Sequence, residues 1–245
     1  MPIRITVINP NTTQSMTDLI EAEARRLAGP DTVVTGRTPS MGPASIESHY
    51  DEALAVPGLL EIIREDDEAD AFVLACFGDP GLDAAREAAS RPVVGIAEAA
   101  MKVASLLGRS FSVVTTMSRT VGRAWDLTRT YGLERQCAGV HACDIPVLEL
   151  DEDRDHTYAV ILSFAKAALA EDGSDAIVLG CAGMAGLPEL LTEQLGVPVV
   201  DGVAAGTVLA EGLVRLRLRP STTGELAPPP AKAYTGALRS FGRIP

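Results

Sequence analysis

The chain has 245 residues, of which 47% are hydrophobic and 22% are charged, and its formal net charge at pH 7 is -12. These proportions are typical of a globular protein with one large domain or two small ones. The acidic balance argues against nucleic acid or an anionic membrane surface as a partner, because both would repel the chain. No apolar stretch reaches the roughly 18 to 20 residues that span a bilayer. The N-terminal sequence MPIRITVINPNTT lacks the pattern of a signal peptide, so we expect a cytoplasmic location.

Short apolar runs rich in Val and Ile alternate with longer segments of helical period along the chain. The runs predict strands over residues 3–8, 32–35, 71–75, 93–96, 111–115, 140–145, 176–180 and 197–200. They lack polar alternation, which indicates burial on both faces of a parallel sheet. The segments between them predict helices over residues 15–28, 51–65, 82–90, 97–107, 120–131, 155–172, 187–195 and 203–217. This alternation predicts an α/β fold with parallel sheets.

One phrase of the sequence occurs twice, as DAFVLACFGDPGL (70–82) and as DAIVLGCAGMAGL (175–187). The offset that aligns Cys76 with Cys181 also aligns Gly81 with Gly186, and RPVVGIAEAA (91–100) then matches VPVVDGVAAG (197–206) with one residue of slack. IRITVINPNTT (3–13) likewise resembles SFSVVTTMSRT (110–120). The repeat predicts two related halves. We expect residues 1–105 and 206–245 to form the first subdomain and residues 106–205 the second.

Cys76 and Cys181 each follow a predicted strand and precede a predicted helix. Ligands of parallel α/β sheets bind outside the carboxyl ends of the strands, so we expect the two thiols on opposite walls of one cleft. A nearby helix N-terminus is expected to lower the pKa of each thiol. Two facing thiols suit inversion of a stereocentre, because one removes a proton and the other returns a proton to the opposite face. The alternative is that both are small buried hydrophobes.

Other chemistries have weaker support in the sequence. Cys137, His141 and Cys143 lie close together in CAGVHACD, but a metal site needs other spacings and more ligands, so we expect no metal. Pyridoxal phosphate would need a lysine in a suitable context, which none of the three lysines has, and there is no P-loop and no G-x-S-x-G elbow. We therefore expect no cofactor.

Three charged or titratable residues near these motifs stay open. His49 either touches the substrate or covers a loop. Arg119 and Arg123 follow a Thr-rich turn, where they either bind an anion or lie on a solvated helix face.

Six segments together resemble the hydantoin racemase branch of the aspartate/glutamate racemase superfamily, from about residue 3 to residue 215. They are INPNTT (8–13), MGPASIESHYDEA (41–53), ACFGDPGLDAARE (75–87), VVGIAEAAM (93–101), SVVTTMSRT (112–120) and VLGCAGMAGL (178–187). The resemblance implies two pseudo-symmetric flavodoxin-like subdomains with the active site in the cleft between them, and cofactor-independent catalysis by Cys76 and Cys181. Glutamate racemases carry Asp-Ser after the first strand. This chain has Asn9-Pro10-Asn11 there, a neutral loop that suits an imide ring better than a zwitterion.

The resemblance further implies racemisation of 5-substituted hydantoins at C5, with a small molecule as partner and a homo-oligomeric assembly. The residues expected to bind the ring or shape the pocket are Asn11, Ile46, Phe77, Gly78, Asp79, Thr116, Met117, Ser118, Ala182, Gly183 and Met184. Allantoin racemase shares these motifs and stays open, since an apolar pocket favours alkyl and aryl hydantoins and polar partners near His49 or Arg119 favour allantoin. A binding module with an idle cleft is the non-enzyme alternative. Residues 219–245 are rich in Pro and Gly and predict an irregular segment, and whether Tyr234 covers the cleft stays open.

Overall fold

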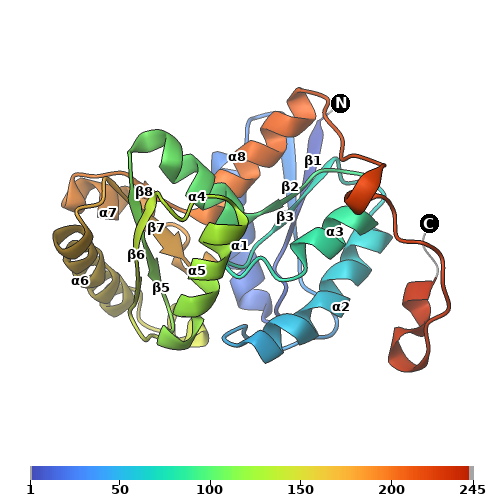
Figure 1. Ribbon diagram of the computed structural model, residues 1–245, viewed down its shortest axis with the longest axis horizontal. Helices are drawn as coiled ribbons and strands as arrows, with labels where there is room; N and C mark the ends of the chain where they lie inside the picture. Colours follow the sequence, from blue (N-terminus) through green and yellow to red (C-terminus); the bar gives the residue numbers. More distant parts are fainter. Residues whose placement is uncertain (1, 243–245) are drawn as a thin grey trace.

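Each half of the chain contains one parallel sheet in the computed structural model, which describes residues 2–242. The first sheet has the strand order β2-β1-β3-β4 and the second has β6-β5-β7-β8, so the strands of the two sheets correspond one to one. The strands are β1 (Ile3–Ile8), β2 (Thr32–Arg37), β3 (Ala71–Leu74), β4 (Val93–Gly95), β5 (Phe111–Thr115), β6 (Cys137–Ala142), β7 (Ala176–Gly180) and β8 (Val199–Val200). The two sheets lie side by side (Figure 1), and the predicted α/β class with parallel sheets is confirmed.

Helices follow the strands in the predicted alternation. They are α1 (Gln14–Leu27), α2 (His49–Glu65), α3 (Leu82–Ala88), α4 (Ile96–Leu107), α5 (Val121–Thr130), α6 (Arg154–Asp172), α7 (Pro188–Leu195) and α8 (Gly202–Arg215). Short 3-10 helices are η1 (Ser118–Thr120), η2 (Val147–Glu149), η3 (Ala182–Met184), η4 (Gly224–Leu226) and η5 (Gly236–Gly242). Side chains start several helices: Ser48 caps α2, Asp153 caps α6 and Asp201 caps α8, each by accepting a backbone N–H of the first turn.

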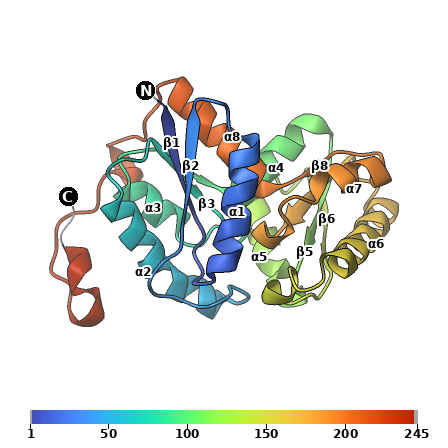
Figure 2. The same cartoon turned by 180° about the vertical axis from the view of Figure 1, so that it is seen from behind.

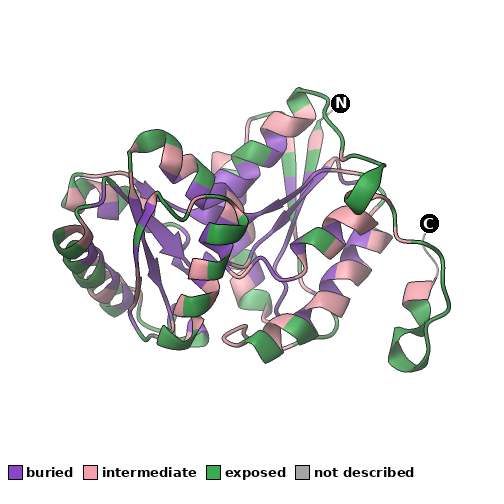
Figure 3. Ribbon diagram, viewed as in Figure 1, coloured by how far each residue is buried: buried purple, intermediate pink, exposed green. Residues whose placement is uncertain are grey.

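The burial of the central strands accounts for the apolar runs from which they were predicted. All residues of β3, β5 and β7 are buried, because helices cover both faces of each sheet (Figure 3). The edge strands β2 and β6 are different, with exposed residues between the buried ones. The strand predicted at 140–145 was therefore placed three residues too late. The true β6 ends at Ala142, and Asp144 takes a left-handed conformation with φ 53 that ends the extended run.

The helices α4 and α8 exchange places between the two halves. Helix α4 follows the first sheet in the chain but packs against β7 and β8 of the second, whereas α8 packs against β1, β3 and β4 of the first. The two helices also contact each other near their N-termini, where a Cβ at Gly202 would lie only 2.8 Å from the carbonyl oxygen of Ile96. The exchange joins the two sheets through a shared layer of helices (Figure 2).

The C-terminal segment after α8 is largely irregular and contains η4 and η5. Figure 1 shows η5 beyond α2 and α3, where Arg64 donates a hydrogen bond of 3.1 Å to the carbonyl oxygen of Ser240. Tyr234 lies in the same outer region, so it does not cover the cleft. Residues 243–245, the end of the segment predicted to be irregular, lie outside the described residues. Within residues 2–242, no helix combines the length and apolar character that crossing a membrane requires.

Candidate active site

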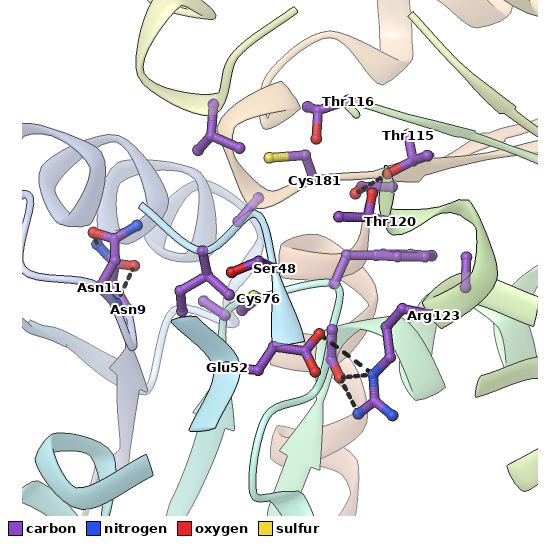
Figure 4. A pocket seen from close by; sticks show the side chains of 18 of the residues that line it. Asn9, Asn11, Ser48, Glu52, Cys76, Thr115, Thr116, Thr120, Arg123 and Cys181 are labelled. Atoms are coloured by element: carbon purple, nitrogen blue, oxygen red, sulfur yellow. Dashed lines mark hydrogen bonds and ion pairs between the residues drawn. The ribbon is translucent and has the colours of Figure 1, made fainter. Parts of the chain in front are cut away.

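A cavity of about 60 Å³ lies where the carboxyl ends of the central strands of both sheets meet (Figure 4). Asn9 and Asn11 line it after β1, and residues 75–78 line it after β3. Residues 115–116 enter it at the end of β5, and residues 180–182 enter it at the end of β7. Both halves therefore contribute equivalent strand ends to one site, as the repeat in the sequence predicts.

The two cysteines of the repeat both line this cavity. Cys76 comes from the first half and Cys181 from the second, and both are partly buried free thiols (Figure 4). The backbone N–H of Gly183 donates to the Cys181 sulfur at 3.4 Å. The backbone N–H of Gly78 stands in the same relation to Cys76 and lowers the pKa of that thiol. Each sulfur thus has a hydrogen-bond donor from its own turn.

Burial outweighs these donors in setting the ionisation of the thiols. Burial, with smaller contributions from the neighbouring Cys181 and Glu52, raises the pKa of Cys76 to about 12. The pKa of Cys181 is likewise raised to about 12, chiefly by burial. The prediction of a lowered pKa is therefore wrong. Loss of hydration destabilises each thiolate more than the nearby backbone N–H group stabilises it. Both thiols rest in the protonated form at neutral pH.

A charged pair borders the cavity on the Cys76 side. Glu52 from α2 lies 3.4 Å from the Arg123 guanidinium of α5, and both residues line the cavity. Arg123 also donates two hydrogen bonds, of 2.7 and 3.1 Å, to the carbonyl oxygen of Gly78 (Figure 4). Burial raises the pKa of Glu52, although Arg123 opposes the shift. The pair brings fixed polar groups from both halves to the turn that carries Cys76.

The neutral loop after β1 forms a hydrogen-bonded rim of the cavity. Asn9 donates from its side-chain amide to Asn11 at 2.8 Å and to Thr17 at 3.0 Å. The Asn11 side-chain oxygen also accepts the backbone N–H of Thr13 at 2.9 Å. Both amides are buried, so this rim is rigid and carries no net charge.

Eight of the thirteen residues expected at the site line the cavity and five do not. Those that line it are Asn11, Ile46, Cys76, Phe77, Gly78, Thr116, Cys181 and Ala182. Gly183 lies behind the Cys181 sulfur, and Met184 is fully buried in the core of the second half. Met117 is half-buried, and the exposed Ser118 donates its N–H to Asp144 at 2.7 Å. Asp79 is buried and points toward the N-terminus of α4.

Several lining residues were missed because helix packing, rather than any motif, directs them into the cavity. Besides Glu52 they include Met16, Ser48, Thr120 and Val147, whereas Arg123, which the sequence left open, also lines the cavity. The sequence offered one usable signal, since Ser48 and Asp51 form a capping box that fixes the start of α2. His49, one residue further, has a side chain that is 78% exposed and lies 3.7 Å from Glu52. Arg119 is exposed outside the cavity.

The Cys137, His141 and Cys143 side chains each have a different partner. Cys137 donates to the Gly139 carbonyl, Cys143 donates to the Thr116 carbonyl, and His141 lies 2.7 Å from Asp172. Within residues 2–242, no group of three or more His, Cys, Asp or Glu side chains is placed to hold a metal ion.

The family of the chain follows from comparison with known proteins. Residues 5–210 match the Asp/Glu/Hydantoin racemase family. The chain belongs to this family. It is accordingly a racemase, an isomerase that inverts a stereocentre of a small-molecule substrate.

Three relatives cover nearly the whole of this racemase. The hydantoin racemase of Pseudomonas sp. (strain NS671) is 45% identical over 98% of both chains. The hydantoin racemase of Rhizobium meliloti is 46% identical over 96% of this chain and 98% of that protein. The structure of allantoin racemase from Klebsiella pneumoniae has 48% sequence identity and a TM-score of 0.95 over 98% of both chains.

Proposed function

We propose that this racemase interconverts the enantiomers of 5-substituted hydantoins, with Cys76 and Cys181 as its two proton-transfer groups and without a cofactor. The observation that carries the proposal is that the two thiols come from related halves and line one cavity. Relatives named hydantoin racemase that match nearly the whole chain support the substrate class.

The reaction moves one proton off C5 and one proton onto it. In one direction the Cys76 thiolate removes the C5 proton, and the Cys181 thiol donates its proton to the opposite face. The thiol and the thiolate have then exchanged places, so the next turnover from the other enantiomer runs in reverse. The intermediate is an enolate, because the carbanion at C5 delocalises onto the adjacent ring carbonyl. The N–H of Gly183 contacts the Cys181 sulfur and therefore supports the thiolate rather than the enolate oxygen.

The first test replaces each cysteine in turn. In Cys76→Ser and in Cys181→Ser we expect racemisation of a pure hydantoin enantiomer, followed by optical rotation, to fall on the order of a thousandfold or more. Cys137→Ser is the matched control, because Cys137 is buried outside the cavity. It should retain its rate. Near-normal racemisation by either active-site variant would contradict the two-thiol mechanism, and loss of activity on dialysis against EDTA would contradict cofactor independence.

Allantoin is the second candidate substrate, and the polar wall of the cavity favours it. Ser48, Glu52 and Arg123 place a hydroxyl, a carboxylate and a guanidinium on one side of the site, where a ureido substituent would find donors and acceptors. The likeness to allantoin racemase from Klebsiella pneumoniae supports this candidate as well. Polarimetric assays on single enantiomers of 5-benzylhydantoin, 5-isobutylhydantoin and allantoin discriminate between the two. A kcat/KM at least tenfold higher for allantoin selects it, and the reverse order selects the alkyl and aryl hydantoins.

We also propose that the protein works in the cytoplasm as a homo-oligomer. Its four free cysteines suit a reducing compartment. Large apolar side chains on and next to α4 and α8 are exposed, among them Leu106, Leu107 and Leu216, which suits a subunit contact. Fractionation of the source cells and light scattering of the purified protein check the two statements.

A further inference from the structure

The turn that carries Cys76 contains a buried carboxylate that does not line the cavity. Asp79 is 3% exposed and has a left-handed backbone with φ 43. One carboxylate oxygen accepts the N–H of Glu98 at 2.9 Å, and the other accepts the N–H of Ala97 at 3.2 Å, both in the first turn of α4. The hydroxyl of Tyr131 donates to the same carboxylate at 2.6 Å. A side chain three residues from Cys76 is therefore held by three donors.

In the second half of the molecule, the equivalent helix α8 is capped by a residue at a different position. The aspartate that caps α8, Asp201, lies at the junction of β8 and α8 and accepts two N–H groups of the first turn. The corresponding residue of the first half is Gly95, whose φ and ψ of -82 and 140 nearly equal the -90 and 136 of Asp201. A Cβ at Gly95 would lie 2.5 Å from the Asp79 carboxyl carbon, so Asp79 fills the space that a capping residue at position 95 would use. The position of the second half that matches Asp79 is Met184.

Capping alone does not require a carboxylate in the cysteine turn, because an aspartate at position 95 has suitable backbone geometry. The Asp79 carboxylate also links the turn to the other half of the molecule through a hydrogen bond from Tyr131. Tyr131 directly follows α5, a helix of the second half, and Arg123 of the same helix holds the Gly78 carbonyl. Arg123 from α5 and Tyr131 directly after it thus bind two neighbouring residues of the turn, Gly78 and Asp79.

We propose that Asp79 is a positioning residue, which with Tyr131 fixes the Cys76 thiol relative to the second half and hence relative to Cys181. The proposal rests on the proposed two-thiol function. It assigns Asp79 a role behind the turn, in place of contact with the substrate. Because proton transfer requires the thiol within hydrogen-bond reach of C5, a small displacement of the turn costs rate on the face that Cys76 serves.

The primary test uses Tyr131→Phe, which removes one hydroxyl and keeps the ring. The readout is exchange of the C5 proton for deuterium in D₂O, measured separately for each enantiomer. The enantiomer served by Cys76 is the one that Cys181→Ser still exchanges. We expect Tyr131→Phe to slow exchange of that enantiomer roughly tenfold when it is added to Cys181→Ser, and to leave exchange of the other enantiomer within about twofold when it is added to Cys76→Ser. Tyr158→Phe is the matched control, because Tyr158 donates to the Leu190 carbonyl at an exposed position and neither residue lines the cavity. Equal slowing of both enantiomers, or of neither, overturns the proposal.

A pair of substitutions separates the positioning role of Asp79 from its capping role. Asp79→Gly with Gly95→Asp moves the carboxylate to the place it has in the second half, and glycine tolerates the φ of 43 at position 79. We expect this variant to unfold at nearly the same urea concentration as the wild-type protein, whereas in the Cys181→Ser background it exchanges the C5 proton more slowly than the protein that keeps Asp79. If both the urea stability and the rate of deuterium exchange equal those of the protein with Asp79, then Asp79 only caps α4. Loss of stability would show that an aspartate at position 95 cannot replace the cap, and it too would overturn the argument.

A third readout does not depend on racemase activity. The rate at which iodoacetamide alkylates each cysteine, followed by peptide mass spectrometry, reports on how each turn is held. In Tyr131→Phe we expect Cys76 to react several-fold faster and Cys181 to react at its original rate. If racemisation does not need both thiols, the proposed function fails while this result still stands. If alkylation of Cys76 is unchanged, the positioning role fails whatever the substrate.

Discussion

The turn that carries Cys76 and the turn that carries Cys181 are copies in sequence, yet different interactions hold them. Polar side chains of the other half secure the first, since Arg123 holds the Gly78 carbonyl and Tyr131 holds Asp79. Apolar packing dominates at the second, where the residue that matches Asp79 is the fully buried Met184, and Arg154 of the same half donates to the Ala185 carbonyl at 3.3 Å. Both turns nevertheless present a thiol with a backbone N–H directed at the sulfur. The two halves therefore share the thiol and its backbone donor, whereas the side chains that support each turn differ.

The same divergence shapes the cavity wall. Met16 and Arg123 each lie three residues after the threonine that ends the matching segments 3–13 and 110–120, and both line the cavity. One is an apolar thioether and the other a guanidinium paired with Glu52. The pseudo-symmetric halves thus each provide a thiol to the cavity and surround it with unequal walls. The proposed inversion needs the first property, and recognition of a substituent needs the second.

The largest of three smaller effects tests whether burial raises the pKa of both thiols as the structure indicates. Burial raises the pKa of both thiols to about 12, so the thiolate that acts as base grows with pH over the neutral and mildly alkaline range. We expect kcat/KM to rise close to tenfold per pH unit between about pH 7 and 9, for both enantiomers alike. Initial rates must be corrected for enzyme-free racemisation. A plateau near pH 7 would mean that a thiol ionises well below its buried value.

The next effect contrasts the glycines that follow the cysteines. A Cβ at Gly183 would lie 2.8 Å from the Cδ1 of Leu150, which is buried, whereas a Cβ at Gly78 would meet the flexible end of Glu52 at 2.6 Å. We expect Gly183→Ala to lower the free energy of unfolding by roughly 1 to 3 kcal/mol. Gly78→Ala should lower it by less than about 1 kcal/mol. Urea denaturation measures both, and equal losses would show that packing holds the two turns alike.

The smallest effect concerns the carboxylate that caps α8. Burial raises the pKa of Asp201 from its ordinary 3.8 to about 6, so the folded protein binds this proton more tightly than the unfolded chain does. The resulting stabilisation is complete below pH 4 and is lost as the pH rises through 6. Replacing wild-type Asp201 by asparagine keeps a capping side chain and removes the titration.

We therefore expect the difference in free energy of unfolding between the wild-type protein and Asp201→Asn to shift by roughly 1 to 3 kcal/mol, in favour of the wild type, between pH 7 and pH 4.5. Thermal or urea unfolding at the two pH values measures this shift. A constant difference would mean that Asp201 keeps its ordinary pKa in the folded protein.

Much of the fold could be predicted from the sequence because the central strands are largely buried. Their residues are mostly apolar, so β1, β5 and β7 were predicted with their observed bounds. The edge strand β6 was misplaced since its residues alternate and pair on one side only. The exchange of α4 and α8 was not predicted as an exchange, because periodicity identifies a helix but does not say which sheet it covers.

Residues of the candidate site that follow strands could also be predicted, whereas those that depend on helix packing could not. Cys76 and Cys181 could be placed in one cleft, since the carboxyl ends of parallel strands converge wherever two such sheets face each other. Glu52 could not be placed there and Arg123 stayed open, because the direction of both side chains depends on how α2 and α5 pack. The pKa prediction failed for a related reason: a helix terminus is visible in the sequence, but the burial of the thiol beside it is not.

The central claim is that each thiol serves one face of C5, and deuterium incorporation at C5 in D₂O tests it most directly. Single enantiomers of a 5-substituted hydantoin are incubated with Cys76→Ser and with Cys181→Ser, and the enzyme-free rate is subtracted. A remaining thiolate can remove a proton and return a deuteron to the same face, so exchange proceeds without inversion. The account predicts that each variant exchanges one enantiomer only, and that the two variants choose opposite ones. Exchange of both enantiomers at comparable rates by a single variant would contradict it.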